Sequence, residues 1–147
     1  MVELRKITKD NYEECFNLKP SEEQKSFVSS NIDSLARAWV FYETVYPFAI
    51  YAGDVMVGFV MMGYYTEKSM YNIWRFMIDE KYQRKGYGKA ALKLSIDYLH
   101  KTFNADEIFI AFKPDNTVAE RLYSSAGFER TGEVENGEIV MRLRCSG

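Results

Sequence analysis

The residues best suited to chemistry lie in a short loop between a predicted strand and a predicted helix. Residues 80–89 follow the apolar run Tyr71–Asp79, and a helical pattern begins after Gly88. The amino terminus of a helix has unpaired N–H groups and about half a positive charge. Gly86 and Gly88 let the backbone come close to a ligand. The positive side chains around them are Arg84, Lys85 and Lys89. The pattern therefore predicts a site for a phosphate group.

Two common nucleotide-binding loops do not fit this segment. A P-loop ends in Lys followed by Ser or Thr, whereas Gly88 is followed by Lys89 and Ala90. The dinucleotide fingerprint has a third glycine and follows an isolated strand near the amino terminus, and this loop has neither. The sequence therefore argues against an ATPase, a GTPase or a dinucleotide-dependent enzyme.

Two motifs, in the same order along the chain, resemble the GNAT superfamily of N-acetyltransferases. The first is Gln83-x-x-Gly86-x-Gly88, after a strand that ends Phe76-Met77-Ile78-Asp79. The second is Asn116-x-x-Ala119-x-x-Leu122-Tyr123-x-x-x-Gly127-Phe128. The resemblance extends over nearly the whole chain. It implies an α/β domain of the acyl-CoA N-acyltransferase fold, with a mixed, mostly antiparallel sheet flanked by helices, and a single domain over residues 1–147.

The resemblance also implies acetyl-CoA as the co-substrate. Its pyrophosphate would lie on the backbone amides of the loop, and its pantetheine arm would pair with the strand before the loop. Asn116 would contact that arm, and Tyr123 would be the general acid that protonates the departing CoA thiolate. The implied cofactor-binding residues are Phe76, Met77, Ile78, Gln83, Arg84, Lys85, Gly86, Tyr87, Gly88, Lys89 and Asn116.

The implied reaction is direct attack of a primary amine on the thioester, with no covalent enzyme intermediate and no metal. Cys15 and Cys145 are then packing or surface thiols, and the single histidine, His100, is a bystander. With two cysteines near opposite ends of the chain and one histidine between them, a zinc site is not expected.

Three segments are further similar to bacterial spermine/spermidine acetyltransferases: Val57–Tyr64, Trp74–Gln83 and Asn136–Met141. This similarity implies a polyamine such as spermine or spermidine as the acceptor. Residues 1–70 carry ten acidic and seven basic residues, and this excess would attract a polycation. Four aromatic residues fit either a groove for the methylene chain or ordinary core, and they are Trp39, Phe41, Tyr42 and Tyr46.

The sequence does not identify the general base. Polyamine acetyltransferases tend to carry an acidic residue where this chain has Trp74, and protein-acetylating relatives place a Glu on the strand that here reads Ile110-Ala111-Phe112. The remaining candidates are Glu43, Glu67 and Asp79. Two other functions stay open: acetylation of a protein N-terminus or lysine, and a non-catalytic CoA-binding module. Retention of Asn116 and Tyr123 argues against the module, because a pure binder needs no proton donor.

The elements that must position these residues begin with a strand, two helices and a hairpin. Val2–Ile7 alternates as a strand, and Asp10 can cap a first helix. A capping box at Ser21 predicts a second helix to about Ala36. The segment Trp39–Phe48 fits a short helix or a loop. Strands at Phe48–Ala52 and Val55–Tyr64 flank the tight turn Gly53-Asp54.

The second half predicts a strand, two helices and three further strands. After the strand Tyr71–Asp79, an apolar stripe from Leu92 to Phe103 indicates a helix, which leads to a strand at Glu107–Phe112. A second capping box, from Thr117 to Glu120, opens a helix that ends at Gly127. The closing strands are Phe128–Thr131 and Ile139–Arg144, with a turn at Asn136-Gly137.

The composition is that of one globular domain. The chain has 147 residues, of which 47% are apolar and 27% charged, with three prolines, and this excludes a disordered chain. No apolar run approaches the ~20 residues of a membrane span, and the net charge of −2 is small. We expect a soluble, cytoplasmic protein with neither nucleic acid nor membrane as a partner. The oligomeric state stays open, with a homodimer among the alternatives.

Overall fold

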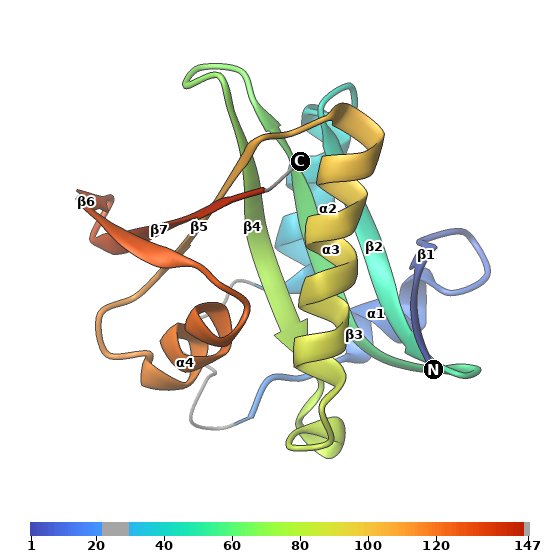
Figure 1. Cartoon of the computed structure of the whole chain (residues 1–147). Helices are drawn as coiled ribbons and strands as arrows, with labels where there is room; N and C mark the ends of the chain where they lie inside the picture. The colour runs from blue at the N-terminus through green and yellow to red at the C-terminus, as the bar shows by residue number, and fades with distance from the viewer. Residues whose placement is uncertain (22–29, 146–147) are drawn as a thin grey trace.

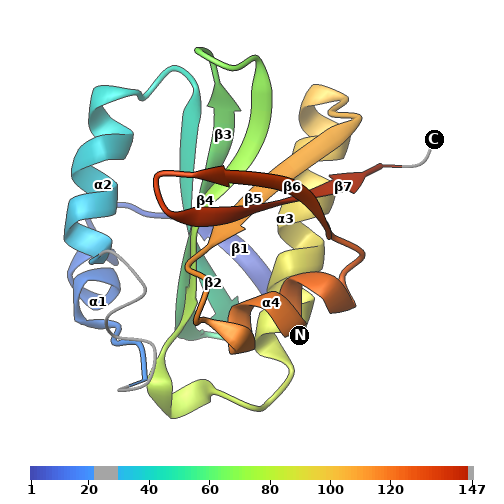
Figure 2. The same ribbon diagram turned by 90° about the vertical axis from the view of Figure 1, so that its left-hand side faces the viewer.

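The computed structural model describes residues 1–21 and 30–145, which form a seven-stranded sheet with helices on both faces (Figures 1 and 2). The strands are β1 (Val2–Lys6), β2 (Val45–Ala52), β3 (Val55–Tyr65), β4 (Met70–Ile78), β5 (Glu107–Phe112), β6 (Glu129–Glu135) and β7 (Glu138–Arg144). The helices are α1 (Tyr12–Asn17), α2 (Asn31–Val40), α3 (Tyr87–Phe103) and α4 (Thr117–Ser125), with a short 3-10 helix, η1 (Glu80–Tyr82). No helix in the described residues is long and apolar enough to cross a membrane.

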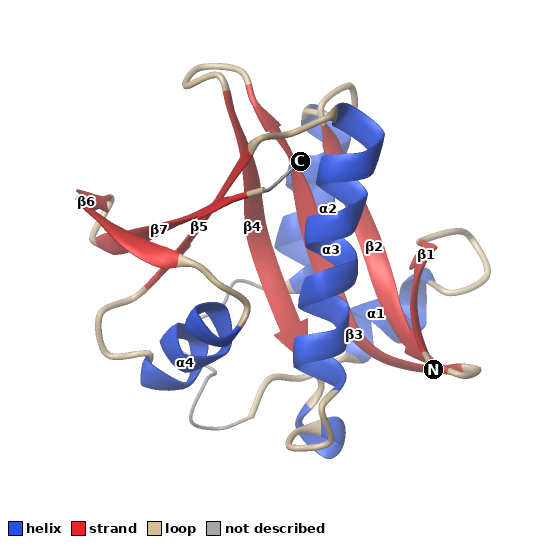
Figure 3. Ribbon diagram, viewed as in Figure 1, coloured by secondary structure: helices blue, strands red, loops and turns tan. Residues whose placement is uncertain are grey.

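The sheet is antiparallel except at one pair of strands. Its order is β1-β2-β3-β4-β5-β7-β6, and only β4 and β5 run parallel. The parallel ladder joins Tyr71–Ile73 to Ile108–Ile110 and then ends. Beyond it, β4 and β5 diverge (Figure 3). The predicted mixed, mostly antiparallel sheet is confirmed, and it opens between these two strands.

A β-bulge accompanies this divergence. On β3, Met61 pairs with Arg75 and Met62 pairs with Ile73, so Trp74 is an extra residue on β4. A bulge bends its strand and increases the local twist. From Trp74 onward β4 pairs with β3 but no longer with β5. The far edge of residues 75–78 therefore carries no strand ladder.

Two apolar clusters hold the helices to the two faces of the sheet. One contains Leu92 and Leu99 of α3 with Ile108 of β5, and all three side chains are fully buried. The other contains Cys15 of α1 and Ala38 of α2. Burying a side chain the size of Leu contributes about 1.5–3 kcal/mol relative to leaving it exposed. The clusters fix α3 on one face of the sheet and α1 and α2 on the other.

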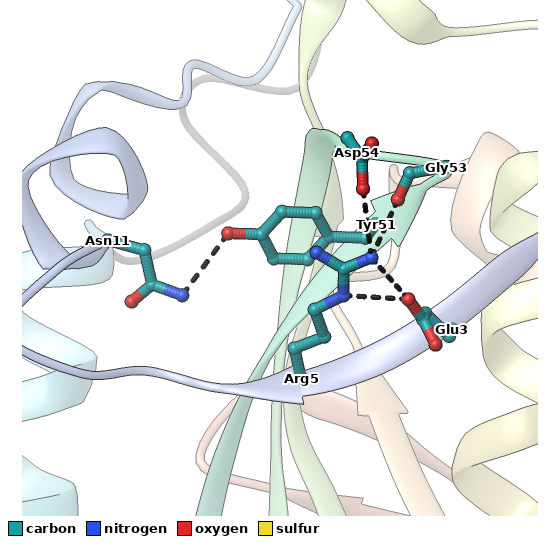
Figure 4. A network of polar contacts seen from close by, with 6 residues as sticks. All are labelled: Glu3, Arg5, Asn11, Tyr51, Gly53 and Asp54. Atoms are coloured by element: carbon teal, nitrogen blue, oxygen red, sulfur yellow. Dashed lines mark hydrogen bonds and ion pairs between the residues drawn. The ribbon is translucent and has the colours of Figure 1, made fainter.

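The edge strand β1 is anchored to the β2–β3 hairpin by Arg5 (Figure 4). The Arg5 guanidinium lies 4.2 Å from the centre of the Tyr51 ring and donates a hydrogen bond of 3.0 Å to the Gly53 carbonyl. It also pairs with Glu3. The Tyr51 hydroxyl accepts a 3.2 Å hydrogen bond from the Asn11 side chain. These contacts connect β1, the hairpin turn and the start of α1.

Most predicted elements are confirmed. The order of helices and strands agrees, β5 spans the predicted Glu107–Phe112, and the hairpin turns at Gly53-Asp54. The N-cap of α1 is Asn11 and not the predicted Asp10. The turn between β6 and β7 has positive φ at Asn136 (52°) and Gly137 (78°), as a tight hairpin turn requires.

The boundaries around α2 differ from the prediction. The capping box that begins at Ser21 runs into residues 22–29, which lie outside the described residues. Ser30 caps α2, because its hydroxyl accepts a 3.0 Å hydrogen bond from the Asp33 amide. The helix runs past Ala36 to Val40, and β2 already begins at Val45. The segment 39–48 is therefore the end of a helix, a turn and the start of a strand.

The predicted cap of α4 is wrong by one residue. Asn116, and not Thr117, is the N-cap, and its side-chain oxygen accepts a 3.2 Å hydrogen bond from the Ala119 amide. Glu120, the other half of the predicted capping box, instead pairs with Arg130 at 2.7 Å. An ion pair to β6 thus replaces the local bond that the spacing suggests.

Candidate active site

A cavity of about 460 Å³ lies where β4 and β5 diverge. Its walls come from the end of β4, the loop before α3, the end of β5, the first turns of α4 and the start of β7. Of the predicted site residues, these line it: Phe76, Met77, Ile78, Gln83, Arg84, Gly86, Gly88, Lys89, Asn116 and Tyr123. Lys85 and Tyr87 belong to the same loop and helix start but are not among the lining residues. Residues 47 positions apart in sequence, Phe76 and Tyr123, therefore share one site.

The β4 wall offers backbone as well as side chains. Phe76 and Ile78 pack toward the cluster under α3, whereas Met77 belongs to the cluster under α1 and α2. Because β5 has left the ladder here, the edge of this strand faces the cavity. An extended ligand with amide groups can bind such an edge as an added strand. The Ile78 carbonyl already accepts a 2.6 Å hydrogen bond from Gln83, which ties the loop to the strand end.

The loop turns into α3 through two residues with positive φ. Arg84 has φ 62°, and Gly86, the N-cap of α3, has φ 82°. The first turn of α3 contains no acidic residue. Its unpaired N–H groups and the side chains of Arg84 and Lys89 make this end of the cavity positive. The geometry suits a phosphate group here.

Tyr123 and Asn116 come from α4. Tyr123 is 7% exposed and its ring lies 6.4 Å from Phe112 and 6.3 Å from Phe128, measured between centroids. Burial, and then the negative charge of Glu138, raise the pKa of Tyr123 above its ordinary value. The hydroxyl therefore stays protonated at neutral pH and can serve as a proton donor. Asn116 is also buried, and its side-chain oxygen is used as the helix cap.

Glu138 is an acidic lining residue of the cavity that is absent from the predicted site. It opens β7 directly after the Asn136-Gly137 turn and lines the cavity with Tyr123. It lies one residue before the predicted strand, Ile139–Arg144. Only the pairing of Ile139 with Phe112 places it beside the end of β5, and a single sequence carries no signal for that long-range register.

The three predicted candidates for the general base separate in space. Glu43 is exposed and lines neither this cavity nor the second one described below. Glu67 lines the second cavity. Asp79 is 5% exposed, and its two carboxylate oxygens accept hydrogen bonds of 2.9 Å from the backbone amides of Lys81 and Lys19. The geometry gives Asp79 the role of joining η1 to the chain after α1.

We therefore expect Asp79→Ala to destabilise the fold. The change leaves two backbone N–H groups without their acceptor, each costing about 1–3 kcal/mol where the group stays buried. Chemical denaturation should show a loss of about 2–4 kcal/mol in the free energy of unfolding. A variant of unchanged stability that has lost its activity would instead mark Asp79 as a catalytic group.

A second cavity, of about 290 Å³, adjoins the first and shares Trp74 and Arg75 with it. The rest of its wall consists of Arg37, Phe41, Thr44, Val45, Met61, Tyr64, Tyr65, Thr66 and Glu67. The predicted aromatic groove is therefore only partly right. Of its four residues, Phe41 lines this cavity.

The other three aromatic residues of that prediction lie elsewhere. Trp39 and Tyr42 are exposed and stack on each other at 5.8 Å. Tyr46 stacks on Phe103 at 5.2 Å, on the face of the sheet that carries α3. The neighbouring aromatics along the chain thus divide between a helix end and a strand, and they do not form one groove.

The thiols and the histidine do not contribute to the cavity. Cys15 is fully buried, and burial raises its pKa to about 12, so it is a poor nucleophile. Burial also raises the pKa of Cys145. His100 Nδ1 lies 2.8 Å from the Ala105 carbonyl at the end of α3. In residues 1–21 and 30–145, no three His, Cys, Asp or Glu side chains are grouped to hold a metal ion.

Comparison with known proteins identifies the family of the chain. Residues 1–128 match the model of the acetyltransferase (GNAT) family. A spermine/spermidine N(1)-acetyltransferase of Bacillus subtilis is 36% identical over an alignment of 149 positions, which covers 95% of this chain and 96% of that protein.

Solved structures share the fold at lower identity. Spermidine N-acetyltransferase of Vibrio cholerae, in complex with CoA and spermine, superposes with a TM-score of 0.74 at 18% identity, over 96% of this chain and 92% of that one. The PaiA N-acetyltransferase of Thermoplasma acidophilum, in complex with coenzyme A, gives a TM-score of 0.71 at 16% identity, over 99% of both chains. The chain belongs to the GNAT family of acetyltransferases and is an acetyl-CoA-dependent N-acetyltransferase.

Proposed function

We propose that this enzyme transfers the acetyl group of acetyl-CoA to a primary amine of a polyamine such as spermine or spermidine, with residues 1–147 acting as one domain. The observation that carries the proposal is the 36% identity, over almost the full length, to a spermine/spermidine N(1)-acetyltransferase. The single-domain proposal is supported by β6 and β7, which lie beyond the family match but join the same sheet next to β5.

In this proposal the first cavity holds acetyl-CoA. The first-turn amides of α3, with Arg84 and Lys89, bind the pyrophosphate, and Lys85 adds positive charge to the same loop. The backbone of residues 76–78 pairs with the pantetheine arm, and Asn116 contacts it from α4. Tyr123 protonates the thiolate when the amine displaces it.

The second cavity suits the remainder of a polyamine. Trp74, Tyr65 and Phe41 provide apolar and aromatic surface for methylene groups and cations. Glu67 provides a negative charge, and the positive charge of Arg37 is balanced by Asp33 at 3.0 Å. Arg75, which lines both cavities, adds a positive charge where they meet. The two cavities share Trp74 and Arg75, so in this proposal one extended amine occupies both.

We expect kcat/KM for spermine to exceed that for a simple alkyl monoamine by at least ~10-fold, about 1.4 kcal/mol of extra transition-state binding. Added salt should reduce this preference, because it screens the attraction between the exposed Glu67 carboxylate and the ammonium groups of spermine that lie away from the reacting amine. A thiol-release assay across a panel of amines, at low and high salt, measures both effects.

Glu67→Gln tests the second cavity directly. It should raise KM for spermine and leave KM for the monoamine unchanged, because the monoamine has no distal cation. Glu43→Gln is the matched control, since Glu43 is exposed and lines neither cavity. Equal rates on spermine and the monoamine, or better rates on a peptide N-terminus, would reject the polyamine proposal while leaving the acetyltransferase in place.

A further inference from the structure

We propose that Glu138 binds the ammonium group of the acceptor amine and takes its proton before the amine attacks the thioester. The inference deepens the proposed function by naming the missing proton acceptor. It requires a primary amine as acceptor but does not depend on that amine being a polyamine.

The position of Glu138 is set by β7. The strand pairs Ile139 with Phe112 of β5 and Glu138 with Glu135 of β6. Glu138 therefore opens the strand at the end of β5, where the cavity lies, and it lines that cavity with Tyr123. The turn before it lies on the side of the sheet that carries α2, whereas α3 lies on the other side (Figure 2).

The charges of the cavity are unevenly distributed. Among the described residues that line it, Glu138 is the one carboxylate. The cationic side chains of the lining are Arg75, Arg84, Lys89 and Lys113. Arg84 and Lys89 gather at the start of α3, where phosphate groups are expected. An ammonium group entering the cavity is repelled by these cations and attracted to Glu138.

The charged and titratable groups near Glu138 come from several elements. Its cross-strand neighbour Glu135 is paired with Lys68 at 2.8 Å, outside the cavity. Tyr123 of α4 is close enough for the charge of Glu138 to contribute to its raised pKa. The other titratable or charged groups of the lining are Arg75 of β4, Tyr82 of η1, Arg84 of the loop, Lys89 of α3 and Lys113 after β5.

The proton balance of the reaction fits a carboxylate and a tyrosine in one cavity. An alkylammonium must lose two protons to become an amide. The Glu138 carboxylate accepts the first, which frees the nitrogen lone pair to form the C–N bond at the thioester carbon. When the C–S bond breaks, Tyr123 gives its proton to the thiolate and recovers one from the acetylated nitrogen. Glu138 then releases its proton to solvent.

Glu138→Gln tests the inference, because the amide keeps the size of the side chain but cannot accept the proton. At pH 7 we expect kcat/KM for the amine to fall by about 10²-fold, within the range for general acid–base catalysis, with acetyl-CoA affinity unchanged. The deficit should shrink as the pH rises toward the amine's own pKa near 10.4, where the amine arrives neutral. Glu133→Gln, on exposed β6, is the matched control and should match the wild type.

The outcomes separate the two proposals. Glu138→Asp keeps a carboxylate and should recover part of the lost activity if a proton acceptor is what the site needs. A deficit in Glu138→Gln that stays constant from pH 7 to 10, or activity equal to that of Glu133→Gln, would overturn the role of Glu138. The assay uses whichever amine the wild type acetylates fastest, so a preference for a monoamine or a peptide rejects the polyamine proposal alone.

Discussion

Replacing Tyr123 with Phe should lower kcat by about 10²-fold or more, equivalent to ~2.7 kcal/mol of transition-state stabilisation. The substitution keeps the ring, which packs between Phe112 and Phe128, and removes only the hydroxyl. Acetyl-CoA affinity should change little, because the cationic end of the cavity is untouched. Steady-state kinetics with separate titration of amine and acetyl-CoA measures both quantities.

The pH dependence of the wild type gives a second measure of this role. Burial and the charge of Glu138 raise the pKa of Tyr123 above its ordinary value. The sign of the shift means that the proton stays on the hydroxyl at every pH up to at least 10, so the donor is not lost across the neutral range. The ratio of wild-type kcat to that of Tyr123→Phe should therefore be similar at pH 7 and at pH 9.

Tyr98→Phe is the matched control. Burial also raises the pKa of Tyr98, but its ring packs on Phe48 and Phe103 on the α3 face and does not line the cavity. This variant should retain wild-type kcat. Wild-type turnover in Tyr123→Phe would mean that another group, or water, protonates the thiolate.

Local signals in the sequence predict most of the fold. The turns at Gly53-Asp54 and Asn136-Gly137 depend on backbone conformations that few residues adopt, and both lie where the residues predict them. The apolar stripe on α3 and the short apolar run of β5 are likewise visible in the sequence, because both elements bury side chains against the core. The predicted capping box of α4 is wrong because Glu120 pairs with Arg130, ten residues away. No local pattern in the sequence reveals this pairing.

The site is less predictable because long-range pairings assemble it. The loop before α3 and the tyrosine of α4 carry motifs, so a sequence can point to them. Glu138 reaches the cavity through the register of β7 on β5, and the second cavity forms from α2, β2, β3 and β4 together. The aromatic residues near the end of α2 are equally hard to place from sequence. Trp39 and Tyr42 face solvent, Phe41 lines the second cavity, and Tyr46 lies on the opposite side of the sheet.

Gly86→Val should abolish the thermal stabilisation that acetyl-CoA gives the wild type. A ligand at 100 times its Kd stabilises the native state by about 2.7 kcal/mol, which raises Tm by on the order of 5–10 °C in a domain of this size. Gly86 has φ 82°, a conformation that β-branched residues avoid. Valine should therefore change the shape of the loop and move the first backbone N–H groups of α3 away from the position where they bind the phosphates. Thermal unfolding with and without ~1 mM acetyl-CoA measures the shift.

A second glycine separates this effect from simple loss of stability. Gly53, in the β2–β3 turn, has φ 63° and, like Gly86, no heavy atom within 4 Å of an added Cβ. Valine at either position should lower the Tm of the free protein, because a left-handed conformation costs an L-residue roughly 1–2 kcal/mol. Gly53→Val should keep the full shift with acetyl-CoA, and Gly86→Val should lose it. An undiminished shift in Gly86→Val would show that acetyl-CoA binds without this loop. No shift in the wild type would show that the protein does not bind acetyl-CoA and would contradict its assigned activity.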